Sequence, residues 1–276
     1  MILILGKGHL GNYLAKSLPN AELWDGKDIA DFSMPNKEFK AVINTVGKTD
    51  LKFCEENPIE AFRCNATAPL SVYQKIAENN KTKGRRTKLI HISSGCLWDG
   101  PYDSKGKPFG PNSPVSPACF YSWSKYAGEA MLLKENLGYN WLHILRPRQL
   151  YSGENSQRNT LVKLMKYEKL LDTPNSMTSC ETVSKTIQAI LEHGDSPRIM
   201  NVYELGIASP LLVGMMLNEA GLRAEPQILN KSDLDSWHKP KRVDTVLSDI
   251  HFERFVEPPL LEDELKRNIE ILKKNA

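Results

Sequence analysis

Short aliphatic runs alternate with amphipathic stretches through the first half of this sequence. Buried strands are predicted where apolar residues are continuous, over residues 1–5, 21–24, 41–44, 88–92 and 141–145. Helices are predicted where apolar residues recur with helical spacing, over residues 12–18, 57–79 and 120–136. Strands that alternate with helices in this way pair in parallel, so the pattern predicts a doubly wound α/β fold.

The alternation weakens after residue 150. Helices are expected over residues 159–171, 183–192, 209–219 and 260–274, and a strand is expected over residues 198–203. Ser209 is a favoured amino-terminal cap, and Pro210 suits the first turn of the helix that follows. We therefore expect a larger domain over residues 1–150 and a smaller α/β substrate lobe over residues 151–276, with a boundary interleaved with the sheet.

The composition is that of an ordinary globular protein. Of 276 residues, 41% are hydrophobic and 25% are charged, with a net charge of +3, so neither disorder nor nucleic-acid binding is indicated. Five cysteines without a Cys-x-x-Cys spacing argue against a disulfide framework and against a zinc site. The apolar start is too short for a signal peptide, and no run resembles a membrane span. We expect a cytoplasmic protein with no metal, membrane or nucleic-acid partner.

The first predicted strand runs directly into a glycine-rich turn. The sequence Gly6-x-Gly8-x-x-Gly11 has the spacing of a dinucleotide-binding motif, in the strand–turn–helix context that this motif requires. Gly6 would permit the tight turn, Gly8 the approach of a pyrophosphate, and Gly11 the close packing of the helix. The amino terminus of that helix, with His9 and Leu10, would face the phosphates. We predict a Rossmann-type domain that binds NAD or NADP; the alternative is a purely structural turn.

Two further strand ends would complete the cofactor cleft. Asp25 follows the second strand, where an acid would hydrogen-bond the ribose hydroxyls of NAD, whereas Lys27 would suit the 2′-phosphate of NADP. The sequence leaves both cofactors open, and Asp25 favours NADH. Small residues after the third strand, Thr45, Val46 and Gly47, would line the same cleft.

A serine, a tyrosine and a lysine form the candidate reaction centre. Ser94 ends the fourth strand, at the sheet edge where α/β proteins bind ligands. Tyr121 and Lys125 are four residues apart, so they share one face of a helix. We expect the ammonium of Lys125 to lower the pKa of Tyr121, and Ser94 to orient a substrate carbonyl for hydride transfer. The alternatives are a chance Tyr-x-x-x-Lys pair and a serine that only begins a loop.

The combination of these motifs resembles the extended short-chain dehydrogenase/reductases that act on nucleotide sugars. Segments 93–98, 120–125, 158–169 and 174–178 are similar to UDP-4-keto-6-deoxyglucose 3,5-epimerase/4-reductases, which make UDP-L-rhamnose. The fold and general activity also resemble those of dTDP-4-dehydrorhamnose reductase. The resemblance implies a nucleotide-sugar substrate and is compatible with a homodimer.

In these dual-function relatives, a cysteine near the catalytic serine and a basic residue of the lobe act in epimerisation, and they fall on Cys96 and Lys163. A C4 ketone acidifies the protons at C3 and C5, which such groups can remove and return. Cys96 alone would more often be a small core residue. Motif register alone distinguishes Lys163 from Lys166 and Lys169 on the same predicted helix.

The resemblance also supplies further contacts. Arg158 and Asn159 match the region that binds the nucleotide diphosphate, with Ser94 and Cys96 at the sugar, although Arg158 or Asn159 could simply cap a helix. The full set of expected cofactor contacts is Gly6, Gly8, His9, Leu10, Gly11, Asp25, Lys27, Asp31, Phe32, Thr45, Val46, Gly47, Asn65, Tyr121, Lys125 and Pro147. The glycine motif is one residue shorter than in the relatives, so the cofactor geometry is expected to differ slightly.

Several functions remain open at this point. The first is a bifunctional, NAD(P)H-dependent 3,5-epimerase/4-reductase of a nucleotide-linked 4-keto-6-deoxyhexose, and its nearest rival is a simple 4-ketoreductase. A 4,6-dehydratase fits less well, because such relatives carry Asp-Glu where this chain has Gly95-Cys96. A non-catalytic nucleotide-binding regulatory subunit is the alternative of another class, and the intact pair of Tyr121 and Lys125 argues against it.

Overall fold

A six-stranded parallel sheet forms the centre of the molecule. The computed structural model describes residues 1–136, 141–193, 196–237 and 240–275. The strands lie in the order β2-β1-β3-β4-β5-β9. Their bounds are β1 Ile2–Leu5, β2 Ala21–Leu23, β3 Ala41–Asn44, β4 Lys88–Ile92, β5 Leu142–Pro147 and β9 Ile199–Val202. Every pair in this sheet is parallel, which confirms the predicted Rossmann-type α/β fold.

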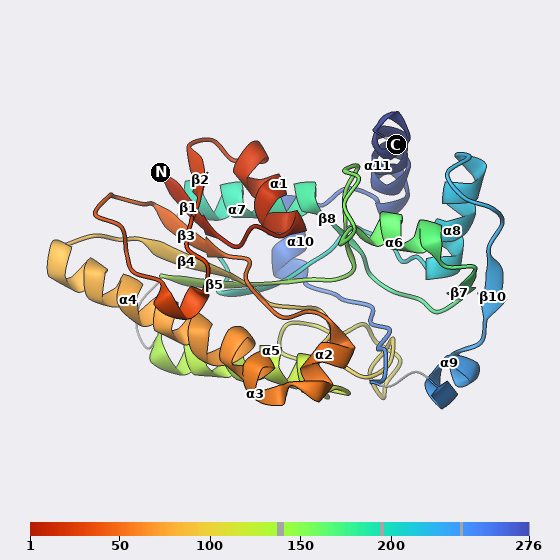
Figure 1. Cartoon of the computed structure of the whole chain (residues 1–276), viewed down its shortest axis with the longest axis horizontal. Coiled ribbons are helices and arrows are strands. Elements are labelled where there is room, and N and C mark those ends of the chain that lie inside the picture. The colour runs from red at the N-terminus through yellow and green to blue at the C-terminus, as the bar shows by residue number, and fades with distance from the viewer. Residues whose placement is uncertain (137–140, 194–195, 238–239, 276) are drawn as a thin grey trace.

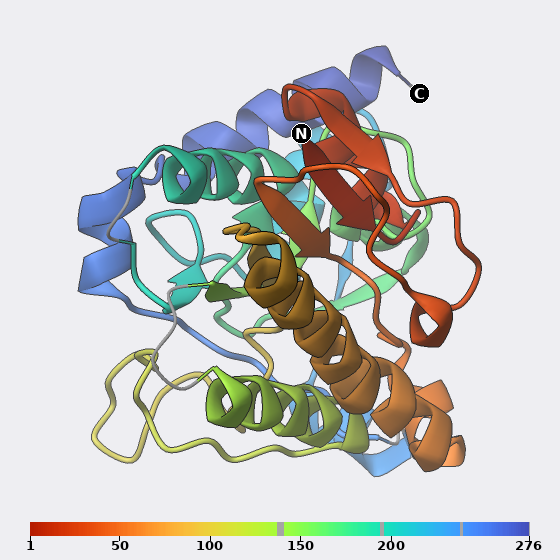
Figure 2. The same ribbon diagram turned by 90° about the vertical axis from the view of Figure 1, so that its left-hand side faces the viewer.

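Helices cover both faces of the sheet (Figure 1). One face carries α1 (His9–Ser17), α7 (Cys180–Glu192) and α10 (Ile250–Val256), whereas α4 (Ala68–Lys83) and α5 (Phe120–Glu135) cover the other. Figure 2 shows α4 and α5 lying side by side. Because successive strand residues point to opposite faces, Ile2 and Ile4 pack under α1 and α7, while Leu3 and Leu5 pack against α4. This double burial explains why the strands are continuously apolar.

The long helix predicted over residues 57–79 is interrupted in the structure. Two short helices, α2 (Leu51–Glu56) and α3 (Pro58–Phe62), lead into a π-helical turn (Arg63–Thr67) and then into α4. The π turn places the fully buried Asn65 against α5, where a Cβ on Gly128 would lie 2.3 Å from the Asn65 carbonyl oxygen. Such a turn inserts one extra residue, and apolar periodicity does not reveal it.

The second lobe has its own small sheets. Strand β7 (Lys169–Leu171) pairs in parallel with β10 (Gln227–Leu229), and β6 (Leu150–Tyr151) pairs with β8 (Thr178–Ser179). The helices of this lobe are α6 (Thr160–Lys166), α8 (Pro210–Glu219), α9 (Lys231–Trp237) and α11 (Leu261–Lys274). The predicted helix over residues 159–171 is therefore wrong at its end, because β7 pairs with a distant strand that local pattern cannot show.

The two parts of the chain are interleaved. Strand β9 and helices α7 and α10, all beyond residue 150, complete the central sheet and one of its covering layers. The cap predicted at Ser209 is confirmed, since its side chain accepts a hydrogen bond from the Leu212 amide. Within the described ranges, none of the helices is long and apolar enough to cross a membrane. The same part of the chain holds no group of three or more His, Cys, Asp or Glu side chains suited to a metal ion.

Candidate active site

The glycine turn after β1 is packed so closely that side chains would not fit. Gly6 has a φ of +108°, which glycine adopts readily, and a Cβ there would lie 2.5 Å from Thr45 Oγ1. A Cβ on Gly11 would lie 1.9 Å from the Gly6 carbonyl oxygen. The turn and the start of α1 are thus pressed together, as the motif predicts.

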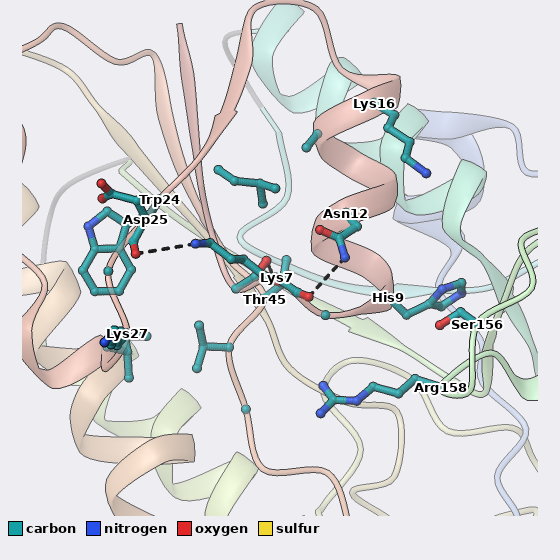
Figure 3. A pocket seen from close by; sticks show the side chains of 18 of the residues that line it. Lys7, His9, Asn12, Lys16, Trp24, Asp25, Lys27, Thr45, Ser156 and Arg158 are labelled. Atoms are coloured by element: carbon teal, nitrogen blue, oxygen red, sulfur yellow. Dashed lines mark hydrogen bonds between the residues drawn. The ribbon is translucent and has the colours of Figure 1, made fainter.

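A cleft of about 1200 Å³ opens beside this turn, at the carboxyl ends of β1, β2 and β3 (Figure 3). That edge is where open α/β sheets bind ligands. The predicted cofactor residues in its wall are Gly6, Gly8, His9, Asp25, Lys27, Thr45, Val46 and Gly47. The second lobe closes the opposite side with Arg158, whose Nη1 would lie 3.3 Å from a Cβ on Gly8. The glycine turn, which has no side chain at Gly6 or Gly8, and the size of the cleft fit a dinucleotide.

Several predicted cofactor contacts lie behind the cleft wall. They are the buried residues Leu10, Gly11, Phe32, Asn65 and Pro147, whereas the predicted contact Asp31 is exposed and does not line the cleft. Phe32 is fully buried and packs edge-on against Trp24, with 5.6 Å between ring centroids. The Asn65 side chain bonds both the amide and the carbonyl oxygen of Lys48, so it fixes the loop that follows β3. These residues shape the cleft through packing.

Two basic residues of the cleft, Lys7 and Lys16, were not predicted from the sequence. Lys7 runs along the cleft floor to the end of β2, where its Nζ donates to the Asp25 main-chain oxygen at 3.5 Å (Figure 3). Exposed Asp25 and Lys27 flank the same end. The position of Lys7 between Gly6 and Gly8 was the signal in the sequence that could have identified it as a cleft residue. This end of the cleft therefore offers one carboxylate and two ammonium groups.

Lys125 is buried beneath the junction between the cofactor cleft and the reaction centre. Its side chain is 3% exposed and its Nζ donates to the Ile92 carbonyl oxygen at 2.8 Å. A Cβ on Gly47, at the end of the cleft, would lie 3.7 Å from that Nζ. Burial lowers the pKa of Lys125 to about 8, and the charge of Glu129 opposes the shift. The ammonium is thus poised to titrate near neutral pH.

Tyr121 does not have the lowered pKa expected from the sequence. Its side chain is buried, and burial raises the pKa of the phenol; the nearby Cys96 adds to this rise, and a hydrogen bond with Ser94 opposes it. That expectation is wrong because Lys125 donates to Ile92 and its effect does not overcome desolvation. Tyr121 is therefore protonated at neutral pH and can act as a proton donor.

A second cleft of about 860 Å³ meets the first at Gly47 and Arg158. It brings together Cys96 and Lys163, which are separated along the chain by a long loop, helix α5 and strands β5 and β6. Lys166 and Lys169 are not in this wall, so Lys163 alone of the three faces the cleft. Desolvation and the positive charges of Arg242 and Arg158 lower the pKa of Lys163.

Asn159 does not face the cleft, contrary to the prediction. It is fully buried, and its amide group donates to the carbonyl oxygens of Ser152 and Glu154. Its side-chain oxygen accepts from the amides of Ser152 and Leu161, capping α6. With both donors used inside the protein, Asn159 is a structural cap, whereas Arg158 extends into the cleft (Figure 3).

The sequence interpretation also missed Arg148, in the wall of the second cleft. Its Nη1 donates to Cys96 Sγ at 2.9 Å. The run Arg146-Pro147-Arg148 at the end of β5 was the only available signal, and it does not tell the two arginines apart. Arg146 instead forms a buried ion pair with Glu129, with 2.5 Å between Nη2 and Oε2.

Known proteins share both the sequence pattern and the fold. Residues 3–206 match the sequence profile of the family described as RmlD substrate binding domain. A bifunctional dTDP-4-dehydrorhamnose 3,5-epimerase/dTDP-4-dehydrorhamnose reductase of Arabidopsis thaliana is 31% identical over 152 residues, which cover 52% of this chain and 46% of that protein. The match thus spans less than half of the length of that plant relative.

Solved structures match over almost the whole chain. The L780 UDP-rhamnose synthase of Acanthamoeba polyphaga mimivirus has a TM-score of 0.80 at 16% identity, covering 98% of this chain and 99% of that one. RMD from Pseudomonas aeruginosa, complexed with NADPH, has a TM-score of 0.76 at 17% identity, covering 100% and 99%. Other matching structures hold NADP or NAD. At these identities the likeness establishes the fold.

Proposed function

Since the chain belongs to the RmlD substrate binding domain family, we propose that it is an NAD(P)H-dependent 4-ketoreductase of a nucleotide-linked 4-keto-6-deoxyhexose in rhamnose formation. The observation that carries this proposal is the placement of Ser94, Tyr121 and Lys125. They lie at the carboxyl end of β4 and on one face of α5, and Lys125 lies beneath Gly47, where the two clefts meet.

Each residue of this centre has a distinct role in the proposed reaction. When bound, the cofactor supplies a hydride to the C4 carbonyl carbon. Ser94 holds the carbonyl oxygen, and Tyr121 donates its phenolic proton to that oxygen as the C4 alcohol forms. The raised pKa of Tyr121 keeps this proton in place until it is needed. Lys125, one helical turn further on, stabilises the phenolate that remains.

The second cleft supplies the features that a sugar nucleotide needs. Lys48, Arg158, Lys163, Lys241 and Arg242 line it, and basic groups of this kind bind a diphosphate. At the cofactor end, Asp25 suits ribose hydroxyls while Lys7 and Lys27 suit a 2′-phosphate. We therefore propose that the enzyme accepts both NADH and NADPH. We further propose that the protein is a cytoplasmic homodimer. All five cysteines are free, which supports a reducing compartment such as the cytoplasm.

We also propose that the enzyme epimerises C3 and C5 before it reduces C4. Support comes from Cys96, which is half-buried and lines the substrate cleft together with Lys163. A simple ketoreductase is the second candidate, because Cys96 also packs against an apolar cluster that includes Cys54, Cys119 and Tyr121.

One experiment tests both parts of this proposal. The purified protein is incubated with NADPH or NADH and either UDP- and dTDP-4-keto-6-deoxyglucose or the corresponding 4-keto-L-rhamnose nucleotides, which are already epimerised at C3 and C5, and the products are identified by NMR. A second incubation, in D₂O without reduced cofactor, follows deuterium entry at C3 and C5 in the wild type and in Cys96→Ser. Oxidation of NAD(P)H without deuterium entry would support the simple ketoreductase. Binding of both ligands without turnover would support a regulatory subunit instead.

A further inference from the structure

Arg148 is a buried cation that reaches the sulfur of Cys96. Its residue exposure is 6%, and its Nη1 donates to Cys96 Sγ at 2.9 Å. Its Nη2 donates to Asn175 Oδ1 at 2.6 Å and to the Val243 carbonyl oxygen. A guanidinium has five N–H donors and no acceptor, so the sulfur must accept this hydrogen bond. A thiolate accepts it more strongly than a thiol does.

Among the residues that the structure describes, Arg148 has no carboxylate as an ion-pair partner, unlike the nearby Arg146. Two residues earlier, near the end of β5, Arg146 pairs with Glu129, and both side chains are almost completely buried. No carboxylate forms an ion pair with Arg148 in the described ranges, and its buried Nε has no hydrogen-bond partner there. Leaving a buried cation unpaired is costly. An anionic sulfur at Cys96 would supply the missing counterion.

We propose that Arg148 holds Cys96 as a thiolate and is the positioning residue that makes Cys96 a base. This inference rests on the epimerisation proposed above. In that reaction the thiolate takes a proton from a carbon beside the C4 ketone, forming an S–H bond, and the electron pair of the broken C–H bond enters the enolate. The Lys163 ammonium returns a proton to the opposite face of that carbon and becomes an amine. The thiol proton then passes through solvent to Lys163, which restores both groups.

The rival role for Arg148 is purely structural. Its bonds to Asn175 and Val243 join two loops of the second lobe, and this function needs no charge on Cys96. The two roles differ in what they predict for the sulfur. A structural arginine leaves the sulfur of Cys96 a thiol, whereas a counterion holds it as a thiolate.

Alkylation by iodoacetamide, a neutral reagent, measures the thiolate without any sugar or cofactor. Cys96 is the only half-buried cysteine of the five, and the other four are buried, so the folded protein should react there first. We expect Arg148→Met to slow alkylation of Cys96 about tenfold at pH 7, and Arg148→Lys to slow it less, because the charge is retained. Peptide mass spectrometry locates the label.

A matched control removes an equal charge from the same cleft. Arg242 lines the same cleft, and no hydrogen bond joins it to Cys96 within the described ranges, so Arg242→Met should leave the alkylation rate nearly unchanged. An equal loss in Arg242→Met and Arg148→Met would overturn the proposal, because it would reflect the general potential of the cleft. An unchanged rate in a folded Arg148→Met variant would also overturn it.

A second measurement leaves Arg148 intact, in case its replacement prevents folding. At pH 7 the ultraviolet thiolate absorbance of the wild type should exceed that of Cys96→Ser by the signal of one thiolate. No difference would overturn the proposal. Deuterium exchange separates the two claims: a thiolate without exchange at C3 or C5 leaves the pairing with Arg148 intact and refutes the epimerase, whereas exchange without a thiolate refutes the role of Arg148.

Discussion

Replacing Lys125 by methionine should make the stability of the protein depend differently on pH. The native state holds the Lys125 ammonium in a buried site and lowers its pKa from 10.5 to about 8, chiefly through desolvation. The unfolded chain therefore binds this proton more tightly than the native protein does. Between about pH 8 and pH 10.5 the unfolded state carries more protons, so the wild type gains stability as pH rises. Below this window the penalty is fully present, and above it the penalty is gone.

The magnitude follows from the two pKa values. Between pH 7 and pH 10 the wild type should gain about 2 to 3 kcal/mol relative to Lys125→Met, because each tenfold difference in proton affinity between the two states corresponds to about 1.4 kcal/mol. For a chain of this length, that corresponds to a relative change in Tm of about 4 °C. Thermal unfolding of both proteins across this range measures the difference, in which the titration of all other groups cancels.

Lys134→Met is the matched control, since it removes an exposed lysine from the last turn of the same helix. Its stability should run parallel to that of the wild type as the pH changes. A Lys125→Met curve that also stays parallel to the wild type would refute the reasoning. If Lys125→Met then lost reductase activity at every pH, this would show that the reaction needs the amine, but it would not support the claim that desolvation lowers the pKa of Lys125.

Three further predictions test the site. Tyr121→Phe should lower single-turnover ketone reduction by about 10² to 10⁴ while NADPH still binds, as followed by fluorescence, because only the proton donor is lost; wild-type turnover would remove Tyr121 from the mechanism. Gly11→Ala, with its Cβ 1.9 Å from the Gly6 oxygen, should lose about 1–3 kcal/mol in urea unfolding and weaken NADPH binding. Asn159→Ala should lower the free energy of unfolding by about 1–2 kcal/mol, because helix α6 loses its amino-terminal cap, and should change the KM for the sugar nucleotide little. Arg158→Ala should raise that KM.

The sheet and the glycine turn could be predicted because their signals are local. A strand buried on both faces must be apolar at every position, and the stretch from Leu89 to Ile92 departs from this only at His91. The turn needs glycine at Gly6 because its φ is +108°, and at Gly11 because the Gly6 carbonyl oxygen occupies the space of a Cβ. Each requirement is set by a few neighbouring residues, so it is visible in the sequence.

The missed features depend on partners far along the chain. Strand β7 forms only because it pairs with β10, almost sixty residues later, and its local pattern continues that of helix α6. Nothing near Arg148 distinguishes it from Arg146, since their partners Cys96 and Glu129 lie on other elements. Asn159 was assigned wrongly for a different reason. Its role as a helix cap is local and visible in the sequence, but the resemblance to known enzymes favoured a role in ligand binding instead.

Two buried cations beside the reaction centre are left without a carboxylate partner. Neither Lys125 nor Arg148 forms an ion pair in the described ranges, although Glu129 neutralises Arg146, two residues before Arg148. Burying unpaired charge destabilises a fold, so packing alone does not account for this arrangement. In the proposed reaction, negative charge develops on the C4 oxygen during reduction and in the enolate during epimerisation. Fixed cations in a water-poor site stabilise such charge without reorganising, so the stability lost in the resting protein is recovered as a lower barrier.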